Sequence, residues 1–344
     1  LTQRISHFSL VVPGDFEAVF DLHLLDELFP YQGSASGEHV KWDALESLKL
    51  DVLTRSRPDF LDVIFCTTVN RFPRLQHLTL DTPLHAIMSP SPTFENLTSL
   101  TIDDMASYST SVCLSILEQC SNLQRCRLRP TRSSSDAEGE PPTIPNVRLP
   151  YLTDLTISNS TGCERTACRI LRQLETPSLR SFVYAIEDLE MSTSDIYRYL
   201  EELIHRSQCQ ERVRVLELRT RQSFNYGYAS RDLEALFALT PNLEVLKLVG
   251  RKMDPEIMLR MPKSVKQLEI IMEYPWIDHS RQWFAETVRE LVEGEEGSME
   301  MGADNGHHLN ASFIISKDGR GAAAARRNLA DVIERTPGLV VHMD

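Results

Sequence analysis

A phrase of the form L-x-x-L-x-L recurs along this chain, as in PRLQHLTL at 73–80 and PNLEVLKL at 241–248. Its last residues alternate between apolar and polar, which is the period of a β-strand with one buried face. Ten such phrases follow one another, and each predicts one strand. Their apolar positions are Ile5/Phe8/Leu10, Leu45/Leu48/Leu50, Leu75/Leu78/Leu80, Leu97/Leu100/Ile102, Leu123/Cys126/Leu128, Leu152/Leu155/Ile157, Leu179/Phe182/Tyr184, Val213/Leu216/Leu218, Leu243/Leu246/Leu248 and Val265/Leu268/Ile270.

Between the phrases, apolar residues at intervals of three and four predict amphipathic helices. The clearest are TSVCLSILEQC (110–120), TSDIYRYLEELIHRS (193–207) and SRDLEALFAL (230–239), with a shorter one expected in FDLHLLDELF (20–29). Thr193 or Ser194 is the predicted N-cap of the second helix and Ser230 that of the third. Hydroxyl side chains suit this position because they accept hydrogen bonds from backbone N–H groups of the first turn.

A unit of strand, turn and helix therefore returns at a mean spacing of about 27 residues, within the 20–29 range of leucine-rich repeats. The predicted fold class is α/β: an irregular leucine-rich-repeat solenoid with a curved parallel sheet on its concave side and helices on its convex side. Burial of one leucine contributes about 1.5–3 kcal/mol. One repeat cannot offset its ordering entropy with so few leucines, whereas a stack of repeats can.

Composition divides the chain into three regions. The predicted solenoid spans 1–292 and carries a disordered insertion at 130–148, where Ser, Pro and acidic residues replace apolar ones. The acidic sequence at 293–308 predicts a flexible linker. Beyond it, LNASFIIS and LVVHMD flank a predicted helix, so 309–344 is expected to form a strand–helix–strand cap at the end of the stack.

Bulk properties narrow the class of protein further. A chain of 344 residues is long for one core, which usually stops growing at about 250–300 residues, so either two domains or an elongated architecture is expected. The net charge of −13 argues against nucleic-acid binding, which needs a basic face. No apolar run is long enough to span a bilayer. The seven cysteines form no C-x-x-C pair, and we expect reduced thiols in a cytoplasmic or nuclear protein.

No motif of a known catalytic mechanism occurs: there is no G-x-S-x-G, G-x-x-x-x-G-K-[ST] or H-E-x-x-H. We expect no enzyme activity, no cofactor and no metal. Three segments each allow two interpretations. KDGRGAAAA (317–325) is a helix start or a phosphate-binding turn, and His307-His308 is a solvated loop or half of a metal site. FNYGYASRD (224–232) is a loop over a repeat edge or, since Tyr favours interfaces, a partner contact.

The surface most suited to binding is the predicted concave face. Residues between and after the last two apolar positions of each phrase point away from the core, and adjacent strands lie about 4.8 Å apart, so equivalent residues stack into columns. One column places Asp51, Asp81 and Asp103 on neighbouring strands, which we call rungs. At this spacing their like charges repel one another unless a nearby cation offsets the repulsion. A basic rung follows, and the far end is more apolar, at Val183, Ala185, Val245, Val249 and Ile271.

The candidate partner-binding residues on this face are Asp51, Asp81, Asp103, Lys49, Thr79, Thr101, Arg125, Arg127, Arg129, Glu217, Arg219 and Lys247. Solenoid proteins generally bind through such a face. The alternative is that these residues are polar only because the outer surface of a strand is solvated.

The phrases with their flanking residues, EQCSNLQRCRL (118–128) and FALTPNLEVLKL (237–248), resemble the "CPNLxxLxL" repeats of fungal, basidiomycete-type F-box proteins. The acidic Ser/Pro insertion is similar to those that interrupt such repeats. RISHFSLVV (4–12) resembles the stretch that follows the F-box and opens them. The resemblance covers nearly the whole chain.

The resemblance implies a substrate-binding repeat region of a Skp–cullin–F-box ubiquitin ligase. In that family an F-box with an L-P-x-E-[IL] opening grips the Skp adaptor, and the repeats hold a substrate. That opening is not found here, and the chain starts at Leu1, so we expect it to begin inside a longer protein. The expected partners are a protein substrate on the concave face and a Skp-type adaptor only if an F-box precedes residue 1, with no nucleic acid and no membrane. A monomer is expected. A scaffold with no ubiquitin link, or a cryptic enzyme, is the alternative.

Overall fold

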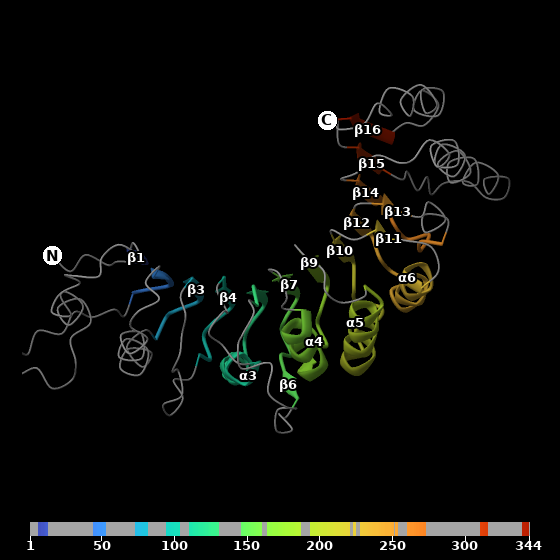
Figure 1. Ribbon diagram of the computed structural model, residues 1–344. Helices are drawn as coiled ribbons and strands as arrows, with labels where there is room; N and C mark the ends of the chain where they lie inside the picture. The colour runs from blue at the N-terminus through green and yellow to red at the C-terminus, as the bar shows by residue number, and fades with distance from the viewer. Residues whose placement is uncertain are drawn as a thin grey trace, which may run out of the picture. The chain divides into compact units, whose positions relative to one another are not determined.

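The structure is a computed structural model in which the following residues are described: 6–12, 44–52, 73–81, 94–103, 110–130, 146–159, 164–186, 193–220, 223–224, 228–250, 252–253, 260–272, 310–315 and 339–343 (Figure 1). The chain divides into two compact units, Leu1–Ser178 and Leu179–Asp344. This division falls inside a leucine phrase. It differs from the predicted boundary at 292, which lies outside the described residues.

The first unit is built on parallel strands in the order β1-β2-β3-β4-β5-β7, with every neighbouring pair in parallel register. Its elements are β1 (His7–Val12), β2 (Ser47–Val52), β3 (His77–Asp81), β4 (Ser99–Ile102), α3 (Thr110–Glu118), β5 (Arg125–Leu128), β6 (Val147–Arg148), β7 (Asp154–Asn159), α4 (Glu164–Gln173) and β8 (Leu174–Glu175). The short strands β6 and β8 pair separately, also in parallel. Helices α3 and α4 lie on the same side of the strands (Figure 1).

The second unit repeats this plan with strands in the order β9-β10-β12-β14-β15-β16, again parallel throughout. Its elements are β9 (Ser181–Ile186), α5 (Thr193–Ser207), β10 (Val215–Thr220), β11 (Ser223–Phe224), α6 (Tyr228–Leu239), β12 (Val245–Gly250), β13 (Lys252–Met253), β14 (Gln267–Met272), β15 (Asn310–Ile315) and β16 (Leu339–Met343). The two-residue strands β11 and β13 pair with each other. Each unit is therefore a solenoid-like α/β arrangement.

Eight strands open with the same hydrogen-bond pattern: β2, β3, β4, β5, β7, β10, β12 and β14. The carbonyl oxygen of Glu46 accepts bonds from the backbone N–H groups of Gln76 (2.8 Å) and His77 (2.9 Å) of the next strand. A carbonyl oxygen has two lone pairs and can satisfy both donors. The residues whose carbonyl plays this part are Ser6, Glu46, Gln76, Thr98 and Gln124 in the first unit and Arg180, Arg214 and Glu244 in the second. The phrases are thus equivalent rungs despite their uneven spacing in sequence.

The apolar positions of the phrases form the core of each unit. In β3 and β4 buried residues alternate with half-buried ones, and the exposed fraction of Leu78, Leu100 and Leu155 is 1% or less. In the second unit Leu216, Leu246 and Leu268 are buried to the same degree. The helices add further buried residues, among them Leu117 and Leu200. The prediction that the recurring leucines lie inside, rung beside rung, is confirmed within each unit.

All ten predicted strands are present, as are the two expected at LNASFIIS and LVVHMD, and the helix predicted at 193–207 has those bounds. The predicted N-caps are wrong, because the helices begin at or before them: Thr193 and Ser194 lie in the first turn of α5, and Ser230 lies in the first turn of α6, which begins at Tyr228. For the same reason the loop expected at 224–232 is shorter: Phe224 ends β11.

The predicted insertion also ends earlier than expected. Val147 and Arg148, assigned to its last two positions, form β6 beside β8, and Val147 is buried. The apolar side chain of Val147 finds a place in the core that composition did not reveal. The predicted helix at 20–29, the linker at 293–308 and the segment at 317–325 lie outside the described residues.

Candidate interaction surface

The turns that precede β5 and β12 are each anchored by a small buried side chain. Cys120 Sγ donates to the carbonyl oxygen of Ile116 at 3.2 Å, and Thr240 Oγ1 donates to that of Leu236 at 3.0 Å. Both residues follow a helix, and both bonds satisfy a carbonyl of its last turn, where intrahelical donors run out. Burial, and then the neighbouring Cys113, raises the pKa of Cys120 to about 12, so its thiol keeps the proton that it donates.

An amide ladder runs along the same turns. Asn96 Nδ2 donates to the carbonyl oxygen of Pro73 at 2.8 Å, and Asn122 Nδ2 donates to that of Glu95 at 2.7 Å. Asn242 makes the equivalent bond to Glu211 in the second unit. These asparagines occupy the same place in their phrases, directly before the first buried leucine. They tie each turn to the turn before it and so hold neighbouring strands in register.

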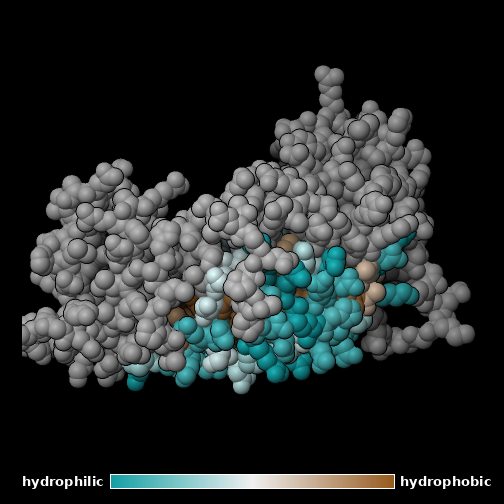
Figure 2. All heavy atoms as spheres, turned by 60° about the horizontal axis from the view of Figure 1, so that its bottom comes forward, coloured by the Kyte–Doolittle hydropathy of each residue, from teal (hydrophilic) through white to brown (hydrophobic). Residues whose placement is uncertain are grey.

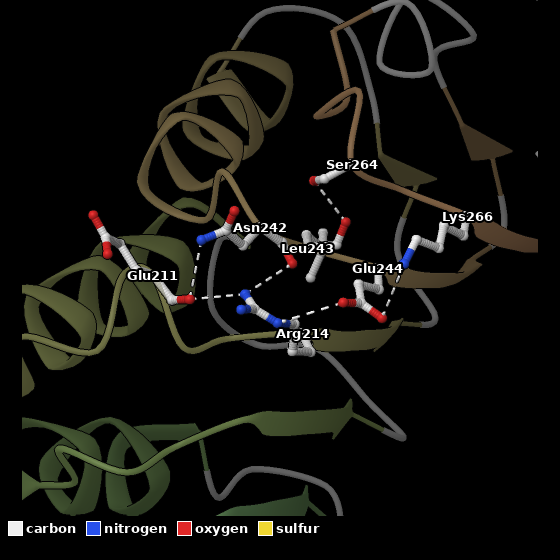
Figure 3. A network of polar contacts seen from close by, with 7 residues as sticks. All are labelled: Glu211, Arg214, Asn242, Leu243, Glu244, Ser264 and Lys266. Carbon is white, nitrogen blue, oxygen red and sulfur yellow. Dashed lines mark hydrogen bonds and ion pairs between the residues drawn. The ribbon is translucent and has the colours of Figure 1, made fainter. Parts of the chain in front are cut away.

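In the second unit a charged network reinforces this ladder (Figure 3). One guanidinium nitrogen of Arg214 donates to the carbonyl oxygens of Glu211 at 2.7 Å and Asn242 at 3.1 Å. Arg214 Nε lies 3.5 Å from Glu244 Oε1, and Lys266 Nζ lies 3.6 Å from Glu244 Oε2. Three successive rungs therefore carry charges of alternating sign at this edge. Figure 2 brings the lower side of Figure 1 forward and shows that the described residues there are mostly hydrophilic.

We call the outward face of a unit the side of its strands that carries the residues alternating with the buried ones. In the first unit, Asp51 and Asp81 occupy facing positions of β2 and β3. The N–H of Asp103 donates to the carbonyl oxygen of Leu80 at 2.8 Å, which sets Asp103 beside Asp81 on the next rung. The predicted column of three aspartates on neighbouring rungs is therefore confirmed for the backbone.

Strand β5 supplies a cation, Arg127, that partly offsets the repulsion within this column. Arg127 Nε lies 3.5 Å from Asp103 Oδ1, longer than a hydrogen bond. The arginine side chain is 57% exposed, and exposed ion pairs contribute only about 0–1 kcal/mol. Asp103 Oδ1 itself is buried and has no hydrogen-bond donor among the described residues. This ion pair offsets part of the electrostatic repulsion between the aspartates. Because the pair is weak, it contributes little to holding the Arg127 side chain in this position.

The predicted basic rung is confirmed as a set of alternating residues in and directly after β5. Arg125 and Arg127 are exposed residues of β5 that alternate with the buried Cys126. Arg129 follows, half-buried, and its N–H donates to the carbonyl oxygen of Ile102 at 2.8 Å, so that the ladder continues through it.

The predicted column of Lys49, Thr79 and Thr101 leads to this rung in parallel register, with Lys49 facing Thr79. Thr79 in turn faces Thr101. Thr101 faces Arg127. On its other side Arg127 faces Thr156.

The second unit presents a different surface. Glu217, Lys247 and Glu269 face one another on successive rungs. Lys247 Nζ lies 2.9 Å from each carboxylate oxygen of Glu269, and Arg219 pairs with Glu217 on the same strand. The predicted residues Glu217, Arg219 and Lys247 are thus engaged with near neighbours. Val183 faces Glu217 and continues this column onto β9. On either side of the column lie half-buried apolar residues: Ala185, Val215, Val245, Val249 and Ile271.

Glu269 was not among the predicted site residues. Its signal was present in the sequence, because Glu, Lys and Glu occupy equivalent positions of three consecutive phrases. Alternating charges at adjacent sheet positions favour cross-strand pairs.

Five cysteines are reduced, buried thiols in the described part of the chain: Cys113, Cys120, Cys126, Cys168 and Cys209. No set of three or more His, Cys, Asp or Glu residues is placed to hold a metal ion within the described ranges. No helix among them is long and apolar enough to cross a membrane. No protein-family model matches the chain, and no curated protein matches its sequence.

Proposed function

We propose that this chain is a leucine-rich-repeat protein-interaction module that binds a protein partner through the outward face of its strands. The observation that carries the proposal is the parallel register, which stacks equivalent residues of successive phrases into columns. A column repeats every 4.8 Å or so. A partner that crosses the strands therefore meets one defined side chain per rung, on a backbone held rigid by the core beneath it.

The parts of each phrase that do not reach this face have a structural role that supports the same proposal. Cys120 and Thr240 anchor the helix ends, and Asn122 and Asn242 form the amide ladder. These are the residues that give the phrases their resemblance to F-box repeats. Since they serve stacking, the residues that select a partner are the variable ones on the outward face.

The more specific form of the proposal is that the chain is the substrate-binding repeat region of an F-box receptor in a Skp–cullin–F-box ubiquitin ligase. The resemblance of EQCSNLQRCRL (118–128) and FALTPNLEVLKL (237–248) to fungal F-box repeats supports it. Such a receptor does no bond chemistry. It holds a target close to a separate enzyme, and this proximity raises the effective concentration of the reacting groups.

The binding face is tested by substituting Asp51, Asp81 and Asp103 together with alanine and comparing the proteins captured from native extract by the variant and the unchanged chain. We expect partner capture to fall severalfold while the circular dichroism spectrum is retained. The matched control changes three exposed glutamates away from this face, Glu46, Glu95 and Glu118, to alanine and removes the same total charge. Equal capture by both variants would exclude the acidic column as the contact.

The ubiquitin-ligase link has its own test. The messenger RNA is read upstream of the codon for Leu1, and the encoded protein is purified from its native cells with its bound subunits. An upstream L-P-x-E-[IL] helical module together with co-purified Skp-type adaptor and cullin is the expected result. If neither the upstream module nor the co-purified subunits are found, the ubiquitin-ligase link is excluded and a repeat scaffold is left. The proposed binding face is tested separately by the aspartate experiment.

A further inference from the structure

We propose that the turns before β5 and β7, residues 121–124 and 150–153, form a docking site for an arginine side chain of a protein partner. The guanidinium group of that arginine stacks on the ring of Tyr151 and donates hydrogen bonds to the carbonyl oxygens of Ser121 and Tyr151. The site lies at the turns and not on the outward face. It therefore goes beyond the proposed function and does not depend on it.

The ladder of side-chain bonds between turns has a gap at this place. Elsewhere in the first unit one carbonyl oxygen of each turn accepts a side-chain donor from the next turn. These bonds run from Asn96 to Pro73 at 2.8 Å, from Asn122 to Glu95 at 2.7 Å and from Ser178 to Pro150 at 2.6 Å. Ser121 holds the equivalent place in the turn before β5, and Tyr151 stands where its donor would be. No described residue donates to the carbonyl oxygen of Ser121 or of Tyr151.

Tyr151 itself is exposed to a degree that the fold does not require. It is a large apolar residue with an exposed fraction of 57%, and it makes no hydrogen bond or ring contact with another described residue. An asparagine at this position would close the ladder, so the tyrosine forgoes a stabilising bond. A residue that breaks a local rule without a structural gain marks a functional position. Exposed tyrosines are frequent anchors of protein interfaces.

The second unit shows how a guanidinium group fits such a pair of turns (Figure 3). Glu211 and Asn242 hold the places in their phrases that Ser121 and Tyr151 hold in theirs. One nitrogen of Arg214 donates to the carbonyl oxygens of both Glu211 and Asn242, at 2.7 and 3.1 Å. The two carbonyl oxygens at the gap therefore occupy backbone positions that accept a guanidinium group elsewhere in this chain.

The occupant is an arginine because of the chemistry that remains at the gap. Gln124 stands where Arg214 stands in the second unit, and its exposed side chain contacts no other described polar group. Neither turn contains a charged residue, and the nearby Arg125 faces Asp154 across β5 and β7. Arginine stacks on aromatic rings and donates to several acceptors at once, whereas lysine is a compact point charge. The net charge of −13 attracts a cation over distance.

The test measures binding of short Gly/Ser peptides to the full chain by saturation-transfer difference NMR, which detects weak complexes. The central residue of the peptide is arginine, lysine or citrulline, which has the shape of arginine without its charge. At physiological salt we expect the arginine peptide to bind at least about threefold more tightly than the other two. Tyr151→Ala should weaken its binding about fivefold, the size of one exposed cation–π contact. Tyr151→Phe should retain it, because the ring is kept.

Two further substitutions fill the site from within the chain. Tyr151→Asn supplies the missing amide, and Gln124→Arg supplies the guanidinium group that Arg214 supplies in the second unit. Each should weaken binding of the arginine peptide at least about fivefold and raise the midpoint of urea unfolding, since each adds a hydrogen bond. The matched control is Gln76→Arg, which adds the same charge at the equivalent place of a turn whose ladder bond is already made. It should leave peptide binding unchanged.

Binding is measured also in the Arg132→Gln background, so that competition from an arginine of the same unit is not mistaken for failure. Three results would overturn the inference: no binding of the arginine peptide in either background, equal binding of the arginine and lysine peptides, or equal losses for Gln124→Arg and Gln76→Arg. The last two would assign the binding to net charge alone. None of these results bears on the outward face, which the triple aspartate variant tests.

Discussion

In the unit of residues 1–178, residues of like charge occupy neighbouring backbone positions: Asp51, Asp81 and Asp103 lie on successive rungs, and Arg125 and Arg127 lie on the next one. In the unit of residues 179–344, Glu217, Lys247 and Glu269 alternate in sign and pair. The strand geometry is the same in both units, since both have parallel register. The two units therefore place different arrangements of charge on the same backbone geometry.

The two units also differ at their turns. The amide ladder is common to both, but the described residues of the second unit add the network of Arg214, Glu244 and Lys266. The first unit uses uncharged hydroxyls at equivalent places, as where Thr98 Oγ1 donates to the carbonyl oxygen of Gln76. Among the described residues, the second unit therefore uses charges as well as amides to connect the turns of neighbouring rungs, whereas the first unit uses hydroxyls and amides at the equivalent places.

The largest expected effect comes from the shared core. Leu100→Ala and Leu246→Ala each remove a fully buried leucine, one from each unit, and should destabilise that unit by about 2–5 kcal/mol. Hydrogen exchange read by mass spectrometry should show faster exchange in the strands next to each substitution. Thr101→Ala, on the outward face, is the control and should change stability by no more than about 0.5 kcal/mol. Similar losses for the leucine and threonine variants would contradict a core made by the phrases.

The next largest effect is expected at alkaline pH, where the stability of the two units should respond differently. Burial raises the pKa of Cys113 and Cys120 from 9.0 to about 12 and that of Cys209 to about 11, so the folded chain keeps protons that the unfolded chain releases. Their contribution to stability is complete below pH 9 and is lost as the pH rises through the folded pKa values. The loss is about 1.4 kcal/mol per pH unit for each thiol.

Alkylation by iodoacetamide between pH 8 and 10, mapped by mass spectrometry, measures this difference directly. Cys209 should be modified before Cys113 and Cys120, because its pKa is raised less. Faster modification of Cys113 and Cys120 than of Cys209 would contradict the burial of those two side chains.

The smallest effect is expected from the paired charges. Lys247→Met removes the half-buried ion pair with Glu269 and should cost about 1 kcal/mol. Raising the salt concentration from 0.1 M to 1 M shortens the Debye length from about 10 Å to 3 Å and should reduce the difference between variant and unchanged chain. Lys266→Met, which removes the longer and more exposed contact to Glu244, should cost less. Urea unfolding at the two salt concentrations measures both, and a larger loss for Lys266→Met would reverse the assignment.

The strands and their register could be predicted from the sequence because the period of two and the repeated phrase constrain every rung in the same way. The exact start of α6 could not, because Ser230 suits a cap by its residue type alone, whereas the helix begins at Tyr228. Val147 was missed because its flanking residues have the composition of a loop.

In the candidate site, the column positions followed from the period, whereas the pairing of Lys247 with Glu269 depended on side-chain conformations that no periodicity encodes. The asparagines of the amide ladder were visible in the sequence, but their acceptors lie 23 to 31 residues away. A recurring polar residue at one position of a repeat is the signal that could have identified them.

The most direct test of the parallel register is disulfide cross-linking between designed cysteines on neighbouring rungs. Thr79 and Thr101 face each other across β3 and β4, and parallel neighbours at about 4.8 Å are within the range of Cα separations that a disulfide spans. The T79C/T101C chain should form this bond on mild oxidation, identified by mass spectrometry, whereas T79C/D103C, two residues out of register, should not. Efficient cross-linking of the second pair but not the first would contradict the register on which every column depends.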